Sequence, residues 1–255
     1  MTIDGAFRAR LLAGEYLTGF WLNLGSPLTA EMAGLAGFDW VLLDHEHGAG
    51  SEETMLHQLQ AVAATPATCL VRIAANEAPR FKRALDAGAA GVMVPYVSTP
   101  DEARAAVNAM RYPPRGMRGV AKLTRASAFG ANFDAYFANA HEWLVTLTQI
   151  ETVEAVANAP AIAAVDGVDV LFVGPMDLTT SMGIPGQYGD QRFHDALDRV
   201  AKAAKGAGKA VGILLLDPAN LGLCQELGYT VVALGSDGGA VAEGLKRSLT
   251  TLETR

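Results

Sequence analysis

The chain has 255 residues, of which 50% are hydrophobic, and it carries a net charge of -7. This acidic balance, with no run of five or six like charges, argues against nucleic acid as a partner, so we expect small-molecule ligands. The length and the apolar share are typical of one (β/α)8 barrel, and we therefore expect a single domain over residues 1–255.

Cysteine usage and hydropathy indicate the compartment. Cys69 and Cys224 are the only cysteines, and their spacing suits neither a disulfide framework nor a short metal motif, which favours a reducing compartment. Residues 1–19 lack the long apolar segment of a signal peptide, and no run of about 18 apolar residues predicts a membrane span. We expect a cytoplasmic protein without a membrane partner.

Short apolar runs alternate along the chain with Ala-rich stretches of helical spacing, which is typical of repeated β/α units around a buried parallel sheet. Strands are predicted over residues 17–24, 39–46, 68–74, 90–97, 143–151, 168–175, 210–216 and 230–236. Helices are predicted over residues 28–36, 51–63, 78–87, 100–110, 152–163, 191–206, 218–227 and 238–249. Residues 112–142 exceed a bare connection and should combine a basic loop with one short helix. Eight such units predict a TIM barrel, whose chemistry lies at the carboxyl ends of the strands.

Two acidic residues follow neighbouring predicted strands. Glu151 ends the fifth strand and Asp177 follows the sixth, so their carboxylates should converge above the barrel. Two oxygen ligands suit Mg²⁺ or Mn²⁺ and leave the other positions of the cation to water and substrate. Each residue alone could merely cap the helix or turn that follows it. Their occurrence on adjacent strands, with Gln149 nearby, favours a metal site.

Arg72 lies in an otherwise apolar strand, where a guanidinium is costly unless it has an anionic partner or reaches the barrel mouth. A substrate carboxylate would accept two hydrogen bonds from it. The alternative is an internal ion pair with a carboxylate such as Asp44 or Asp86.

The segment DHEHGAG places His45 and His47 two residues apart. One interpretation is an H-x-H zinc site on one face of a strand. The other is a general base held in its tautomer by Asp44. The remaining histidines fall in or beside predicted helices: His57, His141 and His194. A binuclear zinc hydrolase would need histidines at later strand ends, so the base interpretation is favoured.

No lysine lies in a predicted strand, where a Schiff-base aldolase would need one. The lysines all fall in predicted helices or loops: Lys82, Lys122, Lys202, Lys205, Lys209 and Lys246. This disfavours imine chemistry. Metal-assisted enolisation remains, in which a cation polarises a carbonyl and stabilises the enolate.

Taken together, six motifs resemble the HpcH/HpaI family of class II, metal-dependent pyruvate aldolases: FDWVLLDHEHG, LVRIA, LDAGAAGVMVPYV, RYPPRGMRGV, QIET and FVGPMDL. The resemblance extends from FWLNLGSP near the start to VALGSD near the end. It implies reversible aldol addition of pyruvate or hydroxypyruvate to an aldehyde, and cleavage of 4-hydroxy-2-oxo acids through a metal-stabilised enolate. Mg²⁺ or Mn²⁺ is the expected cofactor, with Co²⁺ or Zn²⁺ as alternatives.

The resemblance also assigns roles around the bound oxo acid. Glu151 and Asp177 would hold the metal, and Arg72 would contact the oxo acid and its enolate. The substrate-binding set would be completed by Gln149, Gly174, Pro175, Met176, Asp177, Trp21 and Leu214.

Three further residues have implied or open roles. His47 matches the catalytic histidine, with Asp44 as its partner, whereas His45 stands where a small residue is expected. Asp86 matches an acid near the active site of an adjoining subunit.

The resemblance further implies trimers paired into hexamers, with the C-terminal helix exchanged between subunits. Residues 238–249 fit this helix, although their apolar pattern equally suits an ordinary barrel helix. Two other functions stay open at this point: a citryl-CoA or malyl-CoA lyase, and a non-catalytic barrel that binds a small molecule.

Overall fold

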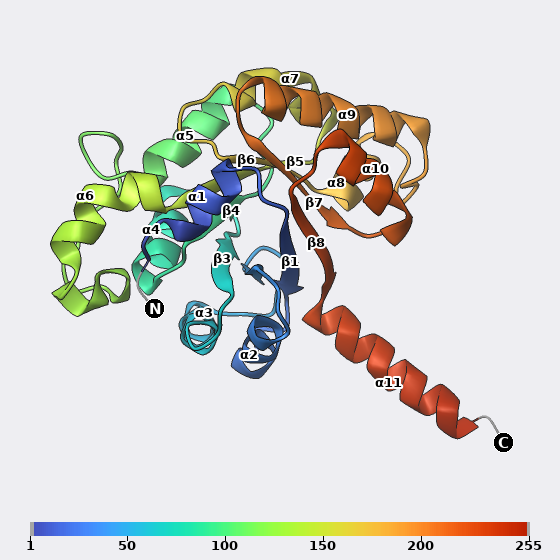
Figure 1. The fold of residues 1–255 in the computed structure, drawn as a ribbon, viewed down its shortest axis with the longest axis horizontal. Helices are drawn as coiled ribbons and strands as arrows, with labels where there is room; N and C mark the ends of the chain where they lie inside the picture. Colours follow the sequence, from blue (N-terminus) through green and yellow to red (C-terminus); the bar gives the residue numbers. More distant parts are fainter. Residues whose placement is uncertain (1–2, 254–255) are drawn as a thin grey trace.

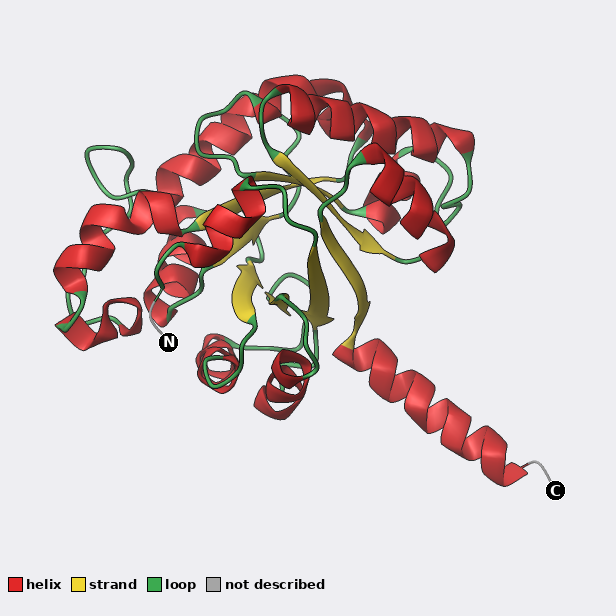
Figure 2. Ribbon diagram, viewed as in Figure 1, coloured by secondary structure: helices red, strands yellow, loops and turns green. Residues whose placement is uncertain are grey.

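The computed structural model describes residues 3–253 and contains eight parallel strands that close into a barrel in chain order (Figures 1 and 2). The strands are β1 (Leu17–Leu22), β2 (Trp40–Asp44), β3 (Thr68–Arg72), β4 (Gly91–Val94), β5 (Val145–Ile150), β6 (Val170–Val173), β7 (Ala210–Leu215) and β8 (Val231–Ser236). The predicted (β/α)8 fold is confirmed. All eight strands are shorter than predicted, because residues at their ends, polar and apolar alike, belong to loops and turns.

The predicted helices are present as α2 (Pro27–Leu35), α3 (Glu52–Val62), α4 (Ala78–Ala87), α5 (Pro100–Met110), α7 (Val153–Ala163), α9 (Gln191–Gly206), α10 (Leu221–Leu227) and α11 (Asp237–Glu253). A 3-10 turn, η2 (Pro218–Asn220), replaces the expected start of α10. The long connection contains η1 (Arg125–Gly130) and α6 (Phe133–Trp143), and two unpredicted helices are α1 (Ala6–Leu12) and α8 (Pro175–Ser181). No helix within residues 3–253 has the length and apolarity needed to cross a bilayer.

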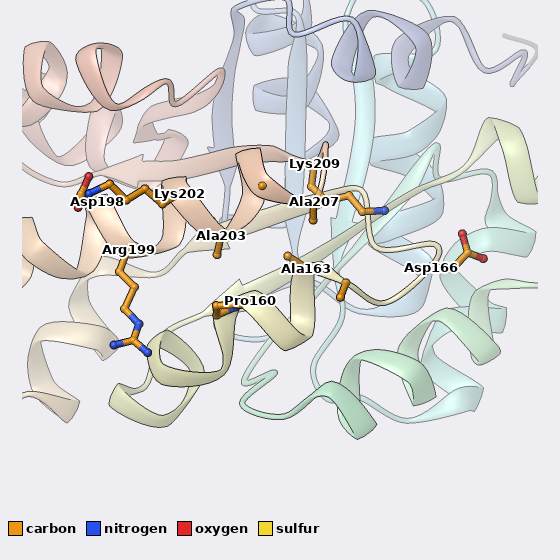
Figure 3. Close-up of a pocket in the computed structure, with 11 residues that line it drawn as sticks. Pro160, Ala163, Asp166, Asp198, Arg199, Lys202, Ala203, Ala207 and Lys209 are labelled. Carbon is orange, nitrogen blue, oxygen red and sulfur yellow. Dashed lines mark hydrogen bonds and ion pairs between the residues drawn. The ribbon is translucent and has the colours of Figure 1, made fainter.

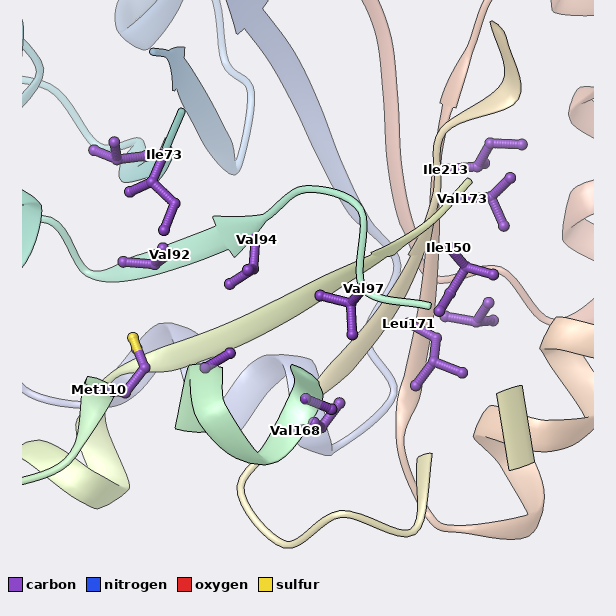
Figure 4. Close-up of a cluster of buried hydrophobic side chains, with 14 of the residues drawn as sticks. Ile73, Val92, Val94, Val97, Met110, Ile150, Val168, Leu171, Val173 and Ile213 are labelled. Atoms are coloured by element: carbon purple, nitrogen blue, oxygen red, sulfur yellow. The ribbon is translucent and has the colours of Figure 1, made fainter. Parts of the chain in front are cut away.

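Two apolar layers build the core. One lies between the strands and the surrounding helices, where Val92, Ile150 and Leu171 are fully buried (Figure 4). The other fills the barrel, where the rings of Trp21, Trp40 and Phe172 pack with centroids 5.7 to 6.4 Å apart. This aromatic plug forms a solid floor beneath the carboxyl ends of the strands.

Strand alternation decides which polar residues face the barrel axis. Successive side chains point to opposite faces, so residues two apart share a face. Leu70 packs inside the barrel, and Arg72 therefore faces inward at its mouth. The same relation connects Leu42 to Asp44 and Leu147 to Gln149.

The last helix, α11, projects away from the barrel (Figure 1). Only its first residue, Asp237, is buried, and it accepts hydrogen bonds from the backbone of Asn23 and the hydroxyl of Thr29 at 2.8 and 2.6 Å. An ordinary barrel helix would pack its apolar face on its own strands. In this structure that face is solvent-exposed.

Candidate active site

A cavity of about 270 Å³ opens above the aromatic plug at the carboxyl ends of the strands. It is lined by Trp21, His47, Arg72, Gln149, Phe172, Val173, Gly174, Pro175, Met176, Asp177, Leu214 and Leu216. Nine of these twelve residues belong to the set expected from the sequence, so the fold brings most of that set together.

Arg72 is held by carboxylates on its own side of the barrel. Asp44 is its register partner on β2, and the Asp44 carboxylate accepts hydrogen bonds from Arg72 Nε and Nη2 at 3.0 and 2.7 Å. The internal ion pair considered for Arg72 is therefore present, and its partner is Asp44. Arg72 Nη1 lies 2.9 Å from Glu46 Oε2 and 3.5 Å from Gln149 Oε1, and the guanidinium stacks 5.3 Å above the Trp21 ring.

This pairing fixes the charge of Asp44. Burial by itself would raise the pKa of Asp44, but the hydrogen bonds and charge of Arg72 hold it below its ordinary value. The backbone N–H groups of Glu46 and His47 also donate to Asp44 Oδ1, at 3.1 and 3.2 Å. Asp44 therefore stays ionised and keeps the loop after β2 in place.

Glu151 and Asp177 meet through a residue that the sequence did not single out. The Tyr96 backbone N–H donates to Glu151 Oε1 at 2.6 Å, and the Tyr96 hydroxyl donates to Asp177 Oδ1 at 3.0 Å. Gln149 Nε2 donates to the other Glu151 oxygen at 3.1 Å. Burial and the nearby charges of Glu46 and Asp177 raise the pKa of Glu151 to about 7, although the Tyr96 N–H opposes them.

A glycine makes room for this carboxylate. A Cβ at Gly174 would clash with Glu151 Oε2 and would lie 3.3 Å from Gln149 Nε2. The glycine therefore allows the end of β6 to approach Glu151 closely, which places α8 and Asp177 beside β5.

The donor set fits a hard divalent cation. Glu151 and Asp177 supply carboxylate oxygens that accept hydrogen bonds from neutral groups, and no arginine or lysine within residues 3–253 pairs with them directly. Within residues 3–253, no group of three or more His, Cys, Asp or Glu side chains could hold a metal, so a site here would use two protein ligands.

The two histidines of DHEHGAG face different places. The strand β2 ends at Asp44, so the alternation that would put both rings on one face stops before His45. His47 lines the cavity with an exposed ring, whereas His45 lines a separate pocket of about 160 Å³ beside α3 and α4. Within residues 3–253 no hydrogen bond joins the His47 side chain to Asp44, whose oxygens accept from Arg72 and from the backbone N–H groups of Glu46 and His47, so the catalytic pairing of His47 with Asp44 stays a prediction. The acid nearest to the His47 ring is Glu46, at 3.8 Å.

Glu46 and Tyr96 are site residues that sequence reasoning missed. Glu46 lies two residues after Asp44, a spacing that could have marked it, and burial raises its pKa. Tyr96 follows Pro95 in a loop and has a φ of 51°, a conformation with no sequence signal for a non-glycine residue.

Asp86 lies outside this cavity. It is on α4, where its carboxylate accepts a hydrogen bond from Arg118 Nη2 at 2.7 Å. The buried Arg118 guanidinium lies 4.5 and 5.5 Å from the rings of Tyr112 and Tyr136, so the cluster anchors the long connection. Any role of Asp86 in a neighbouring subunit stays a prediction.

A larger hollow of about 920 Å³ lies on the outer surface between α7 and α9 (Figure 3). Its wall includes Pro160, Ala163 and Ala203, with Lys202 and Arg199 nearby. Lys202 is already paired with Asp198, and the lining includes Lys209 just before the amino end of β7, so the hollow lies away from the carboxyl ends of the strands, where the chemistry of such barrels is found.

Comparisons with known proteins bear on this site. A family model described as HpcH/HpaI aldolase/citrate lyase matches residues 17–244. Over 238 residues the chain is 42% identical to a hydroxypyruvate/pyruvate aldolase of Cupriavidus necator, covering 93% of this chain and 88% of that protein. Over 243 residues it is 41% identical to a 4-hydroxy-2-oxo-heptane-1,7-dioate aldolase of Salmonella dublin, covering 95% and 92%.

Among solved structures, an HpcH/HpaI aldolase/citrate lyase family protein from Burkholderia cenocepacia J2315 superposes with a TM-score of 0.93 at 38% identity. The match covers 98% of this chain and 100% of that one. The likeness therefore includes every element that carries the cavity.

Proposed function

Because the chain belongs to the HpcH/HpaI aldolase/citrate lyase family, we propose that its cavity carries out reversible aldol addition of pyruvate or hydroxypyruvate to an aldehyde. The protein is a carbon-carbon lyase of the aldolase type. The reverse reaction cleaves 4-hydroxy-2-oxo acids. The observation that carries the proposal is the pair of carboxylates of Glu151 and Asp177. Tyr96 is hydrogen-bonded to both, and the Arg72 guanidinium is connected to Glu151 through Gln149.

Glu151 and Asp177 would hold a divalent cation, with Mg²⁺ or Mn²⁺ preferred because both ligands are hard oxygens. When bound, the cation polarises the substrate carbonyl and makes the adjacent C–H bonds more acidic. The Gln149 side chain donates a hydrogen bond to Glu151 and accepts one from Arg72. It thereby fixes the position of the Glu151 carboxylate relative to the Arg72 guanidinium.

The oxo acid would bind over Trp21 with its oxygens near Arg72. Arg72 is oriented by Asp44 and Glu46, so its N–H groups are fixed before the substrate arrives. The backbone N–H groups of Met176 and Asp177, in the first turn of α8, would donate hydrogen bonds to the substrate carboxylate. Leu214 closes the apolar side of the cavity.

His47 is the proposed base. Its ring is exposed at the cavity edge, with a side-chain exposure of 64%, so it would remove a C3 proton through a bridging water. Glu46 is the nearest carboxylate to the ring and would stabilise the protonated imidazole.

We also propose that the protein is a homo-oligomer, with trimers paired into hexamers, in which α11 packs on a neighbouring barrel. The exposed apolar face of α11 supports exchange of this helix. Asp86 would then act beside a neighbour's cavity. The cytoplasmic location stays a prediction.

Proton exchange at C3 of pyruvate tests the chemistry without the need to know the aldehyde. The chelator-treated protein should exchange C3 protons into deuterated water only after Mn²⁺ is restored, as followed by NMR. Glu151→Gln and Asp177→Asn should abolish exchange, while Asp198→Asn on the outer surface should not change it. Full exchange by the metal-free protein would rule out this mechanism, and no exchange under any condition would favour a non-catalytic binding barrel.

A further inference from the structure

We propose that Tyr96 is a positioning residue that holds the two carboxylates ready for the cation. This role rests on the function proposed above and adds a residue to it. The inference follows from the contacts, the backbone conformation and the exposure of Tyr96.

Tyr96 contacts both carboxylates, from opposite ends of the same residue. Its backbone N–H donates to Glu151 Oε1 at 2.6 Å, and its hydroxyl donates to Asp177 Oδ1 at 3.0 Å. Within residues 3–253, no other residue donates a hydrogen bond to both acids, since Gln149 reaches Glu151 alone. Tyr96 is therefore the direct link between the end of β5 and the first turn of α8.

The backbone of Tyr96 is strained, and its loop is held firmly enough to maintain the strain. A φ of 51° is rare for a bulky residue, and such conformations persist only where the surroundings impose them. Val97 is fully buried, and the Ser98 and Thr152 hydroxyls share a 2.8 Å hydrogen bond. Asn158 Nδ2 also donates to the Ser98 carbonyl at 2.8 Å. These contacts tie the loop after β4 to the segment after Glu151.

The Tyr96 phenol orients the Asp177 carboxylate, which has fewer hydrogen-bond donors around it than the Glu151 carboxylate. Glu151 is 2% exposed and receives two hydrogen bonds, whereas the Tyr96 hydroxyl is the one donor to Asp177 within residues 3–253. Without the phenol, the Asp177 side chain is free to rotate, and the cation must order it on binding. Loss of a group that orients a metal ligand typically weakens metal affinity 10- to 100-fold.

Mn²⁺ binding to the metal-free, full-length protein tests this role directly. Free Mn²⁺ is counted by its electron paramagnetic resonance signal during titration. Tyr96→Phe keeps the ring and the backbone but loses the hydroxyl, so its dissociation constant for Mn²⁺ should rise about tenfold. Tyr96→Gly keeps the N–H and tolerates positive φ, and it should show the same loss. Tyr16→Phe is the matched control, because its phenol is on the surface ahead of β1 and is 43% exposed.

A second measurement separates positioning from a general structural effect. The rate of C3 proton exchange by Tyr96→Phe should approach that of the wild type at saturating Mn²⁺, with only the half-saturating Mn²⁺ concentration raised about tenfold. Equal Mn²⁺ affinity in wild type and Tyr96→Phe would overturn the role of Tyr96 and leave the proposed function intact. No Mn²⁺ binding by the wild type would instead overturn the proposed function, and the role of Tyr96 with it.

Discussion

Arg72 has a fork of N–H groups that a lysine cannot reproduce. Its Nε and Nη2 atoms donate hydrogen bonds to Asp44, whereas Nη1 contacts Glu46 and Gln149 at the cavity. A single ammonium group cannot satisfy the Asp44 carboxylate and reach the substrate at the same time. Arg72→Lys should therefore lower kcat/KM for retro-aldol cleavage roughly 100-fold, the usual cost of losing one such donor.

The control is Arg80→Lys, since Arg80 is on the surface of α4 with a side-chain exposure of 51%. It should leave the kinetics unchanged. Near wild-type kinetics in Arg72→Lys would mean that Arg72 serves only the internal ion pair with Asp44.

Asp44 should give the unfolding free energy a pH dependence of known sign. Its pKa is lower in the folded chain than the ordinary 3.8, so its ionised form stabilises the fold. That stabilisation is complete above the unfolded pKa and is lost as pH falls through the lower, folded pKa. Urea unfolding between pH 6 and pH 3 should therefore show a steeper loss of stability for wild type than for Asp44→Asn.

At pH 6 the Asp44→Asn chain should itself be less stable by about 3 kcal/mol, because it leaves the buried Arg72 charge with Glu46 alone. Parallel pH curves for the two proteins would contradict the assigned pKa shift.

Single residues were predictable from the sequence where strand alternation carries the signal. Trp21, Arg72 and Gln149 continue the inward face of their strands, and all three line the cavity. The Asp44 to Arg72 pairing depends on register between two strands, which local pattern does not give. Tyr96 depends on a loop conformation that tertiary contacts impose, so no spacing rule would have found it.

At the scale of elements, apolar runs predict all eight strands, but most of the exact strand ends differ from the prediction. The early end of β2 at Asp44 matters most, because it sends His45 to a different pocket from His47. The seven-residue helix α8 is absent from the sequence prediction, since Gly174 and Pro175 are typical turn residues and one short helix shows no periodicity. That helix carries Asp177, so the site depends on an element too short to recognise.

For the whole molecule, two apolar stripes are left without a partner in a single chain. Leu28, Met32 and Leu35 on α2 are 64 to 68% exposed. Along α11 the exposed stripe consists of Val241, Leu245, Leu249 and Leu252. Contiguous apolar surfaces of this kind mark interaction sites. Because α11 projects away from the barrel, it does not cover the apolar face of α2. Both stripes are therefore explained if a second copy of the chain supplies the missing helix.

The prediction is that the protein sediments as an oligomer, and that Leu245→Glu combined with Leu249→Glu shifts it to smaller species. Two buried carboxylates at such a contact would be unpaired and costly. Arg247→Glu is the matched control, because it changes the net charge equally but lies about 200° around α11 from Leu245. A monomeric wild type in sedimentation velocity, or an unchanged mass in the double variant, would show that α11 does not hold the subunits together.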